Sequence, residues 1–474
     1  MNAPATRGFR RVLRGLDITL FSVCAILVID QLAASAAIGP SAIFWWLFTL
    51  VVFFVPYGLI SAELGTAYPE EGGIYAWVRR AFGPRWGARA SWLYWVNVAL
   101  WMPSVYVLFA GMFSQLFFPD LSLWTKIALG IAMTWITVYI NVITLAVGKW
   151  VPNAGAVIKA VIMLAIGAGG FWYASRHGVA NDLSLGNLAP SWGAGLAFLP
   201  VIVYNFMGFE LMSGASEEMR NPSRDVPVAI LVSGLLIAAF YLLGTTGILI
   251  ALPVGEIGLV EGLLDSLQRL YEGVSGGTAF VTALGIGALF TFLANMVTWT
   301  LGANRSACEA AERGDLPGVF GRMHPVHRTP ASAAVITGVV STAVMIVYGL
   351  IATDMEDLFW TLFAFSSIVF LLPYLLMFAA FARLRTLEPQ RLRPYRVPGG
   401  SRMAWLLAGI CTLFILQAIV LFVWVPGEPL DPVKLASIAG GVLVTLAVGE
   451  GLIASARRPR AATQGVVPPR EKTA

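Results

Sequence analysis

The strongest constraint on this chain is a series of about twelve apolar stretches, each roughly 20 residues or longer, separated by short polar segments. A helix of about 20 residues crosses the hydrocarbon core of a bilayer, whereas a β-barrel needs alternating segments of about ten. Stretches such as 43–60 are apolar on every face, so the sequence predicts an all-α polytopic protein in a lipid bilayer. The expected spans are 16–37, 42–64, 90–117, 123–146, 153–174, 194–216, 226–251, 278–309, 331–351, 357–381, 403–425 and 432–454.

The basic residues predict how these spans are oriented. Lys and Arg near span ends stay on the cytoplasmic side of a membrane. With the N-terminus inside, the cytoplasmic segments hold most of the 31 Lys and Arg residues, and the outer segments hold only Lys126, Arg176, Arg269 and Lys434. We therefore expect a plasma (inner) membrane protein with both termini in the cytoplasm. The net charge of +5 follows from this topology, which argues against a nucleic-acid partner.

The sixth span contains the run Tyr204-Asn205-Phe-Met-Gly208-Phe209-Glu210. A glycine next to a carboxylate at membrane depth is costly, because hydrocarbon offers neither water nor partners to an opened helix turn or a charge. Such a position is typical of a helix that breaks around a small-molecule site, as in many secondary transporters. The run therefore predicts a broken helix and a substrate site.

Several motifs stand in a fixed order along the chain, most of them at predicted cytoplasmic ends. They are Ala62-Glu63-Leu64, Tyr68-Pro-Glu-Glu-Gly-Gly-Ile-Tyr-Ala-Trp77, Gly208-Phe-Glu210, Asn221-Pro-Ser-Arg-Asp-Val-Pro227, Ala303-Asn-Arg-Ser306 and Arg393-Pro-Tyr-Arg-Val-Pro-Gly399. Together they resemble the motifs of the APC superfamily of amino acid and polyamine permeases, closest to its glutamate/GABA-antiporter-like branch.

The resemblance covers about Leu16 to Leu452 and implies a LeuT-like fold. It predicts two inverted five-helix repeats, at 16–176 and 190–381, with helices one and six broken at the site. Two peripheral helices follow at 403–454. A cytoplasmic arm at 1–15 precedes the repeats, and a tail at 457–474, rich in Arg, Pro and Lys, is expected to be disordered.

The first span departs from the amino-acid-binding members of that superfamily. Their break carries a glycine-serine-glycine type sequence whose backbone donates to a substrate carboxylate, whereas this chain reads Ile29-Asp-Gln-Leu-Ala-Ala-Ser35. Asp30 together with Glu210 would attract an ammonium group. In the alternative, Asp30 bonds only to backbone at the break. Further expected contacts with substrate from this stretch are Gln31, Ala34 and Ser35.

Aromatic and amide side chains complete the expected substrate site. Span three carries Tyr94, Asn97 and Trp101 at helical spacing, and span ten offers Trp360, Phe363 and Phe365. Ring faces attract cationic amines. The alternative for each of these rings is ordinary packing, since 12% of the residues are aromatic.

Lys159 is the one lysine well inside a predicted span. Two interpretations are open. The side chain could reach the cytoplasmic surface as a helix-end lysine. Alternatively its ammonium occupies the gap between spans one, five and eight where sodium sits in sodium-coupled relatives, and proton coupling or sodium-free exchange follows.

Glu63, Glu217 and Glu218 lie next to arginine-rich cytoplasmic loops. We expect them to close an inner gate through salt bridges, or alternatively to form a static ion-pair network.

These features predict a secondary transporter that moves an amino acid, biogenic amine or polyamine by alternating access, either proton-coupled or by exchange. The alternatives are a glutamate/GABA-type exchanger and, in another class, a non-transporting membrane sensor or structural subunit. Three scattered cysteines and three histidines without an acidic partner predict no metal, and no cofactor motif appears. No enzymatic motif was found, and no feature sets the oligomeric state.

Overall fold

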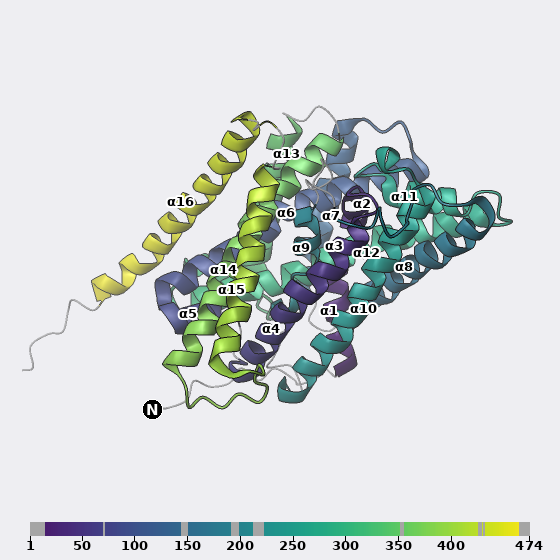
Figure 1. The fold of residues 1–474 in the computed structure, drawn as a ribbon. Coiled ribbons are helices and arrows are strands. Elements are labelled where there is room, and N and C mark those ends of the chain that lie inside the picture. The colour runs from purple at the N-terminus through teal and green to yellow at the C-terminus, as the bar shows by residue number, and fades with distance from the viewer. Residues whose placement is uncertain are drawn as a thin grey trace, which may run out of the picture.

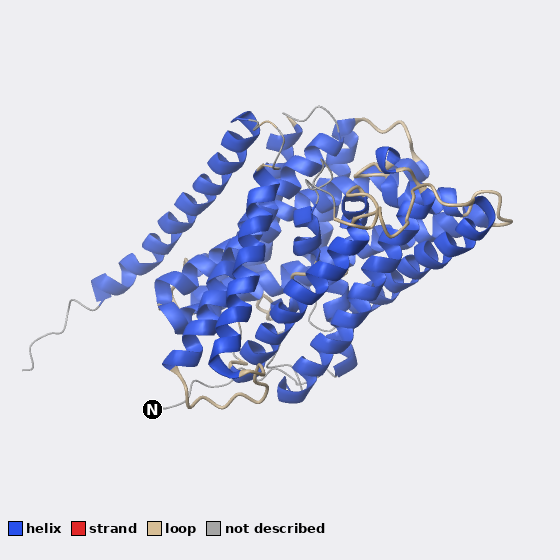
Figure 2. Cartoon of the chain, viewed as in Figure 1, coloured by secondary structure: helices blue, strands red, loops and turns tan. Residues whose placement is uncertain are grey.

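The computed structural model describes residues 15–69, 72–143, 150–190, 199–211, 222–350, 355–424, 429 and 432–463. These residues form helices and loops and contain no strand, which confirms the all-α prediction (Figure 2).

Ten helices in the described part of the chain are long and apolar enough to cross a membrane. The first runs from Ala42 to Ala67 and combines α3 (Ala42–Thr49), a π-helical segment (Leu50–Phe54) and α4 (Val55–Ala67). The other nine are α6 (Pro84–Phe117), α7 (Leu123–Ile143), α8 (Trp150–His177), α10 (Pro222–Ala251), α12 (Gly277–Glu312), α13 (Ala331–Gly349), α14 (Met355–Leu387), α15 (Gly400–Val423) and α16 (Pro432–Thr463).

The two remaining expected spans are broken, as predicted. In the first, α1 (Gly15–Ile26) ends at two non-helical residues, and a short turn (Ile29–Gln31) leads into α2 (Leu32–Ala36). In the sixth, α9 (Leu199–Asn205) unwinds at Phe206–Gly208, and a single turn covers 209–211. The short helices α5 (Ile74–Phe82) and α11 (Gly262–Leu270) lie between spans. Ten long helices and two broken ones account for the expected twelve.

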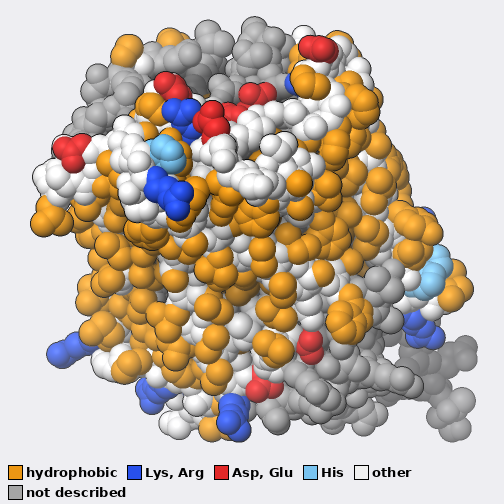
Figure 3. All heavy atoms as spheres, turned by 90° about the vertical axis from the view of Figure 1, so that its right-hand side faces the viewer, with side chains coloured by type: hydrophobic (Ala, Val, Ile, Leu, Met, Phe, Trp, Pro, Cys, Tyr) orange, Lys and Arg blue, Asp and Glu red, His pale blue; other side chains and the backbone are white. Residues whose placement is uncertain are grey.

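The helix α6 forms the centre of the bundle. It is largely buried and packs against α14, α12, α5 and α7. The yellow helix α16 lies at the margin, as expected for a peripheral span (Figure 1). Figure 3 shows a broad belt of hydrophobic side chains with charged groups gathered above and below it, the pattern of a surface that faces lipid.

The ends of the chain are only partly described. The helix α16 continues to Thr463, past residue 457 where the sequence predicts disorder; residues 464–474 lie outside the described residues, as do 1–14 of the N-terminal arm.

Candidate functional site

The broken end of α1 is held by side chains from three other helices. A helix leaves its last four carbonyl groups without partners of its own. The Leu27 N–H donates to Val23 O at 2.9 Å, and side chains satisfy the other three carbonyls. Lys159 Nζ of α8 donates to Cys24 O at 2.7 Å, Trp299 Nε1 of α12 to Ala25 O at 2.9 Å, and Tyr241 Oη of α10 to Ile26 O at 2.5 Å.

Lys159 points into the bundle and not toward the cytoplasmic surface. Its side chain is buried, and Nζ donates a second hydrogen bond to Asn295 Oδ1 of α12 at 3.1 Å. The ammonium therefore joins α1, α8 and α12, which are spans one, five and eight. A cation is favoured at the negative end of a helix dipole such as the end of α1. Its role in coupling stays a prediction.

The sixth span breaks where Gly208 adopts a φ of +132°, a conformation that L side chains rarely adopt. A Cβ at this position would lie 2.9 Å from Ile26 Cγ1 and 3.2 Å from the Trp299 ring. The N–H groups of Gly208 and Phe209 both donate to the hydroxyl of Tyr57, each at 2.9 Å. Glycine is thus required here both by the turn and by the close approach of helix one.

Glu210 is buried and surrounded by three tyrosine hydroxyl groups. Tyr94 of α6 and Tyr374 of α14 donate to Oε1 at 2.9 and 2.6 Å, and Tyr57 of α4 donates to Oε2. No Lys or Arg among the described residues forms an ion pair with it. A carboxylate has about four acceptor positions, so three phenols leave room for one more donor.

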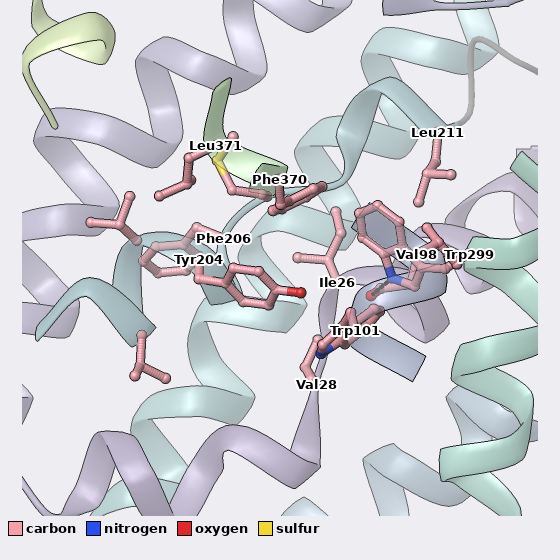
Figure 4. Close-up of a cluster of buried hydrophobic side chains, with 14 of the residues drawn as sticks. Ile26, Val28, Val98, Trp101, Tyr204, Phe206, Leu211, Trp299, Phe370 and Leu371 are labelled. Carbon is pink, nitrogen blue, oxygen red and sulfur yellow. Dashed lines mark hydrogen bonds between the residues drawn. The ribbon is translucent and has the colours of Figure 1, made fainter. Parts of the chain in front are cut away.

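Aromatic rings line the space between the two breaks (Figure 4). Trp101 meets Tyr204 edge to face at 5.9 Å and Trp299 at 5.8 Å between ring centroids. Phe370 closes the group, 5.1 Å from Tyr204 and 5.3 Å from Trp299. Figure 4 shows these rings around Ile26, at the end of the first half of helix one. Of the aromatic residues expected from span ten, Phe363 contacts Tyr204 at 5.1 Å.

Three buried polar side chains here have no hydrogen-bond partner within the described part of the chain. They are the side chains of Asn97, Asn205 and Trp101. Both polar atoms of each amide and the indole Nε1 lack such a partner. A buried amide or indole without a partner costs free energy, which a bound solute with polar groups would recover. All three belong to the residues predicted from the sequence.

Four residues of the stretch after the first break are expected to contact the substrate, and the structure describes the side chains of three of them. Asp30 is in the turn Ile29–Gln31, and its side chain lies outside the described residues. Gln31, Ala34 and Ser35 are buried. Ser35 Oγ donates to Leu32 O at 2.8 Å and lies 3.3 Å from Gln31 O, so its hydroxyl is engaged with backbone at the end of the turn and the start of α2.

The end of the bundle that the sequence predicts to be cytoplasmic is joined by ion pairs. The Glu63 carboxylate is buried, accepts from Arg385 Nε at 2.8 Å and lies 3.2 Å from Arg393 Nε. Nearby, Arg80 donates to Glu388 at 2.6 Å, and this hydrogen bond holds the pKa of Glu388 below its ordinary value. The gate expected at Glu217 and Glu218 lies outside the described residues.

Comparison with known families identifies this architecture. A family model described as amino acid permease matches residues 13–446. The chain belongs to the amino acid permease family. The match confirms the family expected from the motifs, since those permeases are part of the APC superfamily.

Relatives and a solved structure agree with this assignment. The permease is 35% identical over 435 residues to the probable agmatine/putrescine antiporter AguD of Lactococcus lactis subsp. lactis (strain IL1403), covering 91% of this chain and 92% of the relative. It is 24% identical over 396 residues, 80% of this chain and 77% of the relative, to a glutamate/gamma-aminobutyrate antiporter of the same strain. The crystal structure of MhsT in complex with L-phenylalanine superimposes with a TM-score of 0.61 at 13% identity, covering 88% of this chain and all of that one. This likeness confirms the LeuT-like fold.

Proposed function

We propose that this permease is a secondary transporter that moves a cationic amine by alternating access around the two broken helices. The observation that carries the proposal is the Glu210 carboxylate, buried among three phenols with no basic side chain of the described residues paired to it. A carboxylate inside a membrane protein is costly unless a cation meets it. An ammonium group of the substrate supplies that cation, and neighbouring aromatic rings stabilise it further.

The relatives support an amine as the substrate. Agmatine and putrescine, which the name of the 35% identical antiporter contains, are cations without a carboxylate. The glutamate/gamma-aminobutyrate antiporter supports the alternative of a carboxylate-bearing amino acid, at lower identity. A sensor or structural subunit would keep the fold and catalyse no exchange.

Alternating access requires the inner side to open. Glu63 with Arg385 and Arg393 forms the inner closure of the bundle, and we assign Glu217 and Glu218 to the same gate. In this proposal both termini lie in the cytoplasm of the cell and the protein is in the plasma (inner) membrane, in agreement with its basic loops.

Exchange in proteoliposomes tests the proposal. Vesicles preloaded with unlabelled putrescine should accumulate external labelled putrescine, and vesicles without a preload should accumulate far less. Agmatine should compete with the labelled amine. Equal accumulation in preloaded and empty vesicles would point away from exchange, and an absence of any accumulation would favour the sensor alternative.

Lys159 is proposed to serve in coupling. Its ammonium holds the end of helix one, so loss or gain of its proton would change the charge at the break. Lys159→Gln should still bind putrescine but should no longer respond to an imposed pH gradient. Uptake with and without a gradient measures this, with Lys126→Gln on α7 as the matched control. An unchanged response to the gradient in Lys159→Gln would remove Lys159 from coupling.

A further inference from the structure

We propose that Tyr241, together with Tyr57, closes both helix breaks to carboxylates and so restricts the site to amines that lack one. This inference rests on the proposed function and assigns its selectivity to named residues. In a broken helix, opened backbone N–H groups are the natural donors to an anion. In this permease five of the N–H groups at the breaks bond within the chain's own backbone or to Tyr241, and two more bond to Tyr57.

At the first break, a tyrosine engages one of the exposed backbone donors. The Val28 N–H donates to Tyr241 Oη at 2.7 Å. The neighbouring Leu27 N–H bonds to Val23 O at 2.9 Å, and the Gln31 N–H to Val28 O at 3.3 Å. The same Tyr241 hydroxyl donates to Ile26 O, so one phenol satisfies a donor and an acceptor of the break.

The backbone N–H groups at the break of the sixth helix are also hydrogen-bonded within the protein. The N–H groups of Phe206 and Met207 bond within their own chain, to Val203 O at 3.2 Å and Tyr204 O at 3.0 Å. The next two N–H groups, of Gly208 and Phe209, both donate to Tyr57 Oη. Tyr57 in turn donates to Glu210. The two N–H groups that could have bound a substrate anion are therefore bonded to a tyrosine that stabilises the protein's own carboxylate.

Tyr241 is fixed in place by its surroundings. Its ring is buried and stacks on Trp46, with centroids 4.3 Å apart and an interplanar angle of 14°. Trp46 is itself held by a hydrogen bond from Nε1 to Thr245 Oγ1 at 2.9 Å. The hydroxyl also lies 3.3 Å from Asn205 O of α9, so it joins both broken helices.

A carboxylate brought to this site therefore meets few donors and one like charge. The unpartnered groups nearby, Asn97, Trp101 and Asn205, are neutral, and the two amides offer an acceptor as well as donors. Glu210 adds a negative charge that repels a carboxylate and attracts an ammonium group. A buried carboxylate with few donors beside a like charge is costly, whereas the burial cost of an ammonium group is offset by its attraction to Glu210.

The test compares putrescine, a diamine, with ornithine, which is the same diamine bearing a carboxylate. Competition is measured against exchange of labelled putrescine in proteoliposomes. In the wild-type protein, ornithine should compete about 100-fold more weakly than putrescine. Tyr241→Phe keeps the ring and its stacking and frees the Val28 N–H, so the ratio of the two inhibition constants should narrow by roughly tenfold.

Tyr106→Phe is the matched control, because Tyr106 is equally buried and bonds to Thr137 of α7, away from both breaks. Its ratio of inhibition constants should equal that of the wild-type protein. An unchanged ratio in Tyr241→Phe would overturn the inference and leave the proposed function standing. Wild-type protein that exchanges no amine would contradict the proposed function, and the inference with it.

A wild-type measurement decides the matter if Tyr241→Phe does not fold. Ornithine methyl ester has the bulk of the amino acid without the negative charge. Exclusion of the carboxylate predicts that the ester competes within about tenfold of putrescine, whereas free ornithine does not. Equal exclusion of ester and acid would show that size sets the selectivity and would overturn the inference.

Discussion

Glu210→Gln should reduce putrescine exchange by at least ~100-fold, the loss expected when one partner of a buried charge pair is removed. Gln keeps the shape of the side chain, but it carries no charge to meet an ammonium group. Its amide NH₂ would also face phenol hydroxyls that now donate to the carboxylate. Exchange of labelled putrescine in proteoliposomes, corrected for the amount of reconstituted protein, measures the effect.

Two further variants show whether the charge itself is responsible. Glu210→Asp retains the charge on a shorter side chain and should keep more exchange than Glu210→Gln. Glu256→Gln removes an exposed carboxylate from a loop and should behave like the wild-type protein. Full exchange by correctly folded Glu210→Gln would remove Glu210 from the substrate site.

Arg385→Leu should cause the largest loss of stability, about 3–5 kcal/mol, because removing one partner of a buried ion pair leaves an uncompensated charge. Arg385 is nearly buried and bonds to Glu63 through two nitrogens, and its Nη1 donates to Gly400 O at 2.9 Å. The guanidinium thus ties α14 to α4 and to the start of α15. Thermal unfolding of the purified protein measures the effect.

Arg383→Leu is the control for this change. Arg383 lies two positions away on the same helix but is exposed, so its loss should cost less than about 1 kcal/mol. Similar melting temperatures for the two variants would contradict the assigned role of the Glu63–Arg385 pair. A static pair should change stability alone, whereas a gate should also change the transport rate at saturating substrate.

The positions that could be predicted from the sequence are those with unusual local chemistry. Gly208 and Glu210 stand out because a carboxylate is rare at membrane depth and the nearby glycine lets the helix open there. Lys159 stands out for the same reason, and the structure places its ammonium against α1 and α12. The helix breaks follow from the same signals, and the long apolar stretches indicate the spans.

Apart from Tyr94, the phenols that bond to the breaks and to Glu210 could not be predicted, because nothing local distinguishes them. Tyr57 and Tyr374 contact Glu210 from positions more than 150 residues away in the chain, and each is one of 13 tyrosines. Tyr241 is likewise an ordinary buried aromatic residue in a hydrophobic span. Only the packing of α4, α10 and α14 around the breaks gives these phenols their roles.

The structure adds detail to two expectations about the site. Ser35 carries a hydroxyl near the break in sequence, but in a helix such a hydroxyl readily bonds to a carbonyl one turn earlier, and it does so here. Of the aromatic residues expected from span ten, Phe363 contacts Tyr204, and Phe370, which the sequence did not single out, completes the ring cluster with Trp299. Helical periodicity gives the face of a helix, not the depth of its contacts.

The most direct test of the central claim is equilibrium binding of labelled putrescine to purified protein, because binding needs no conformational cycle. The wild-type protein should bind the amine saturably, and Glu210→Gln should bind it about 100-fold more weakly while keeping its melting temperature within a few degrees. Equal affinity of the two folded proteins for putrescine would contradict the claim that the Glu210 carboxylate receives the substrate amine.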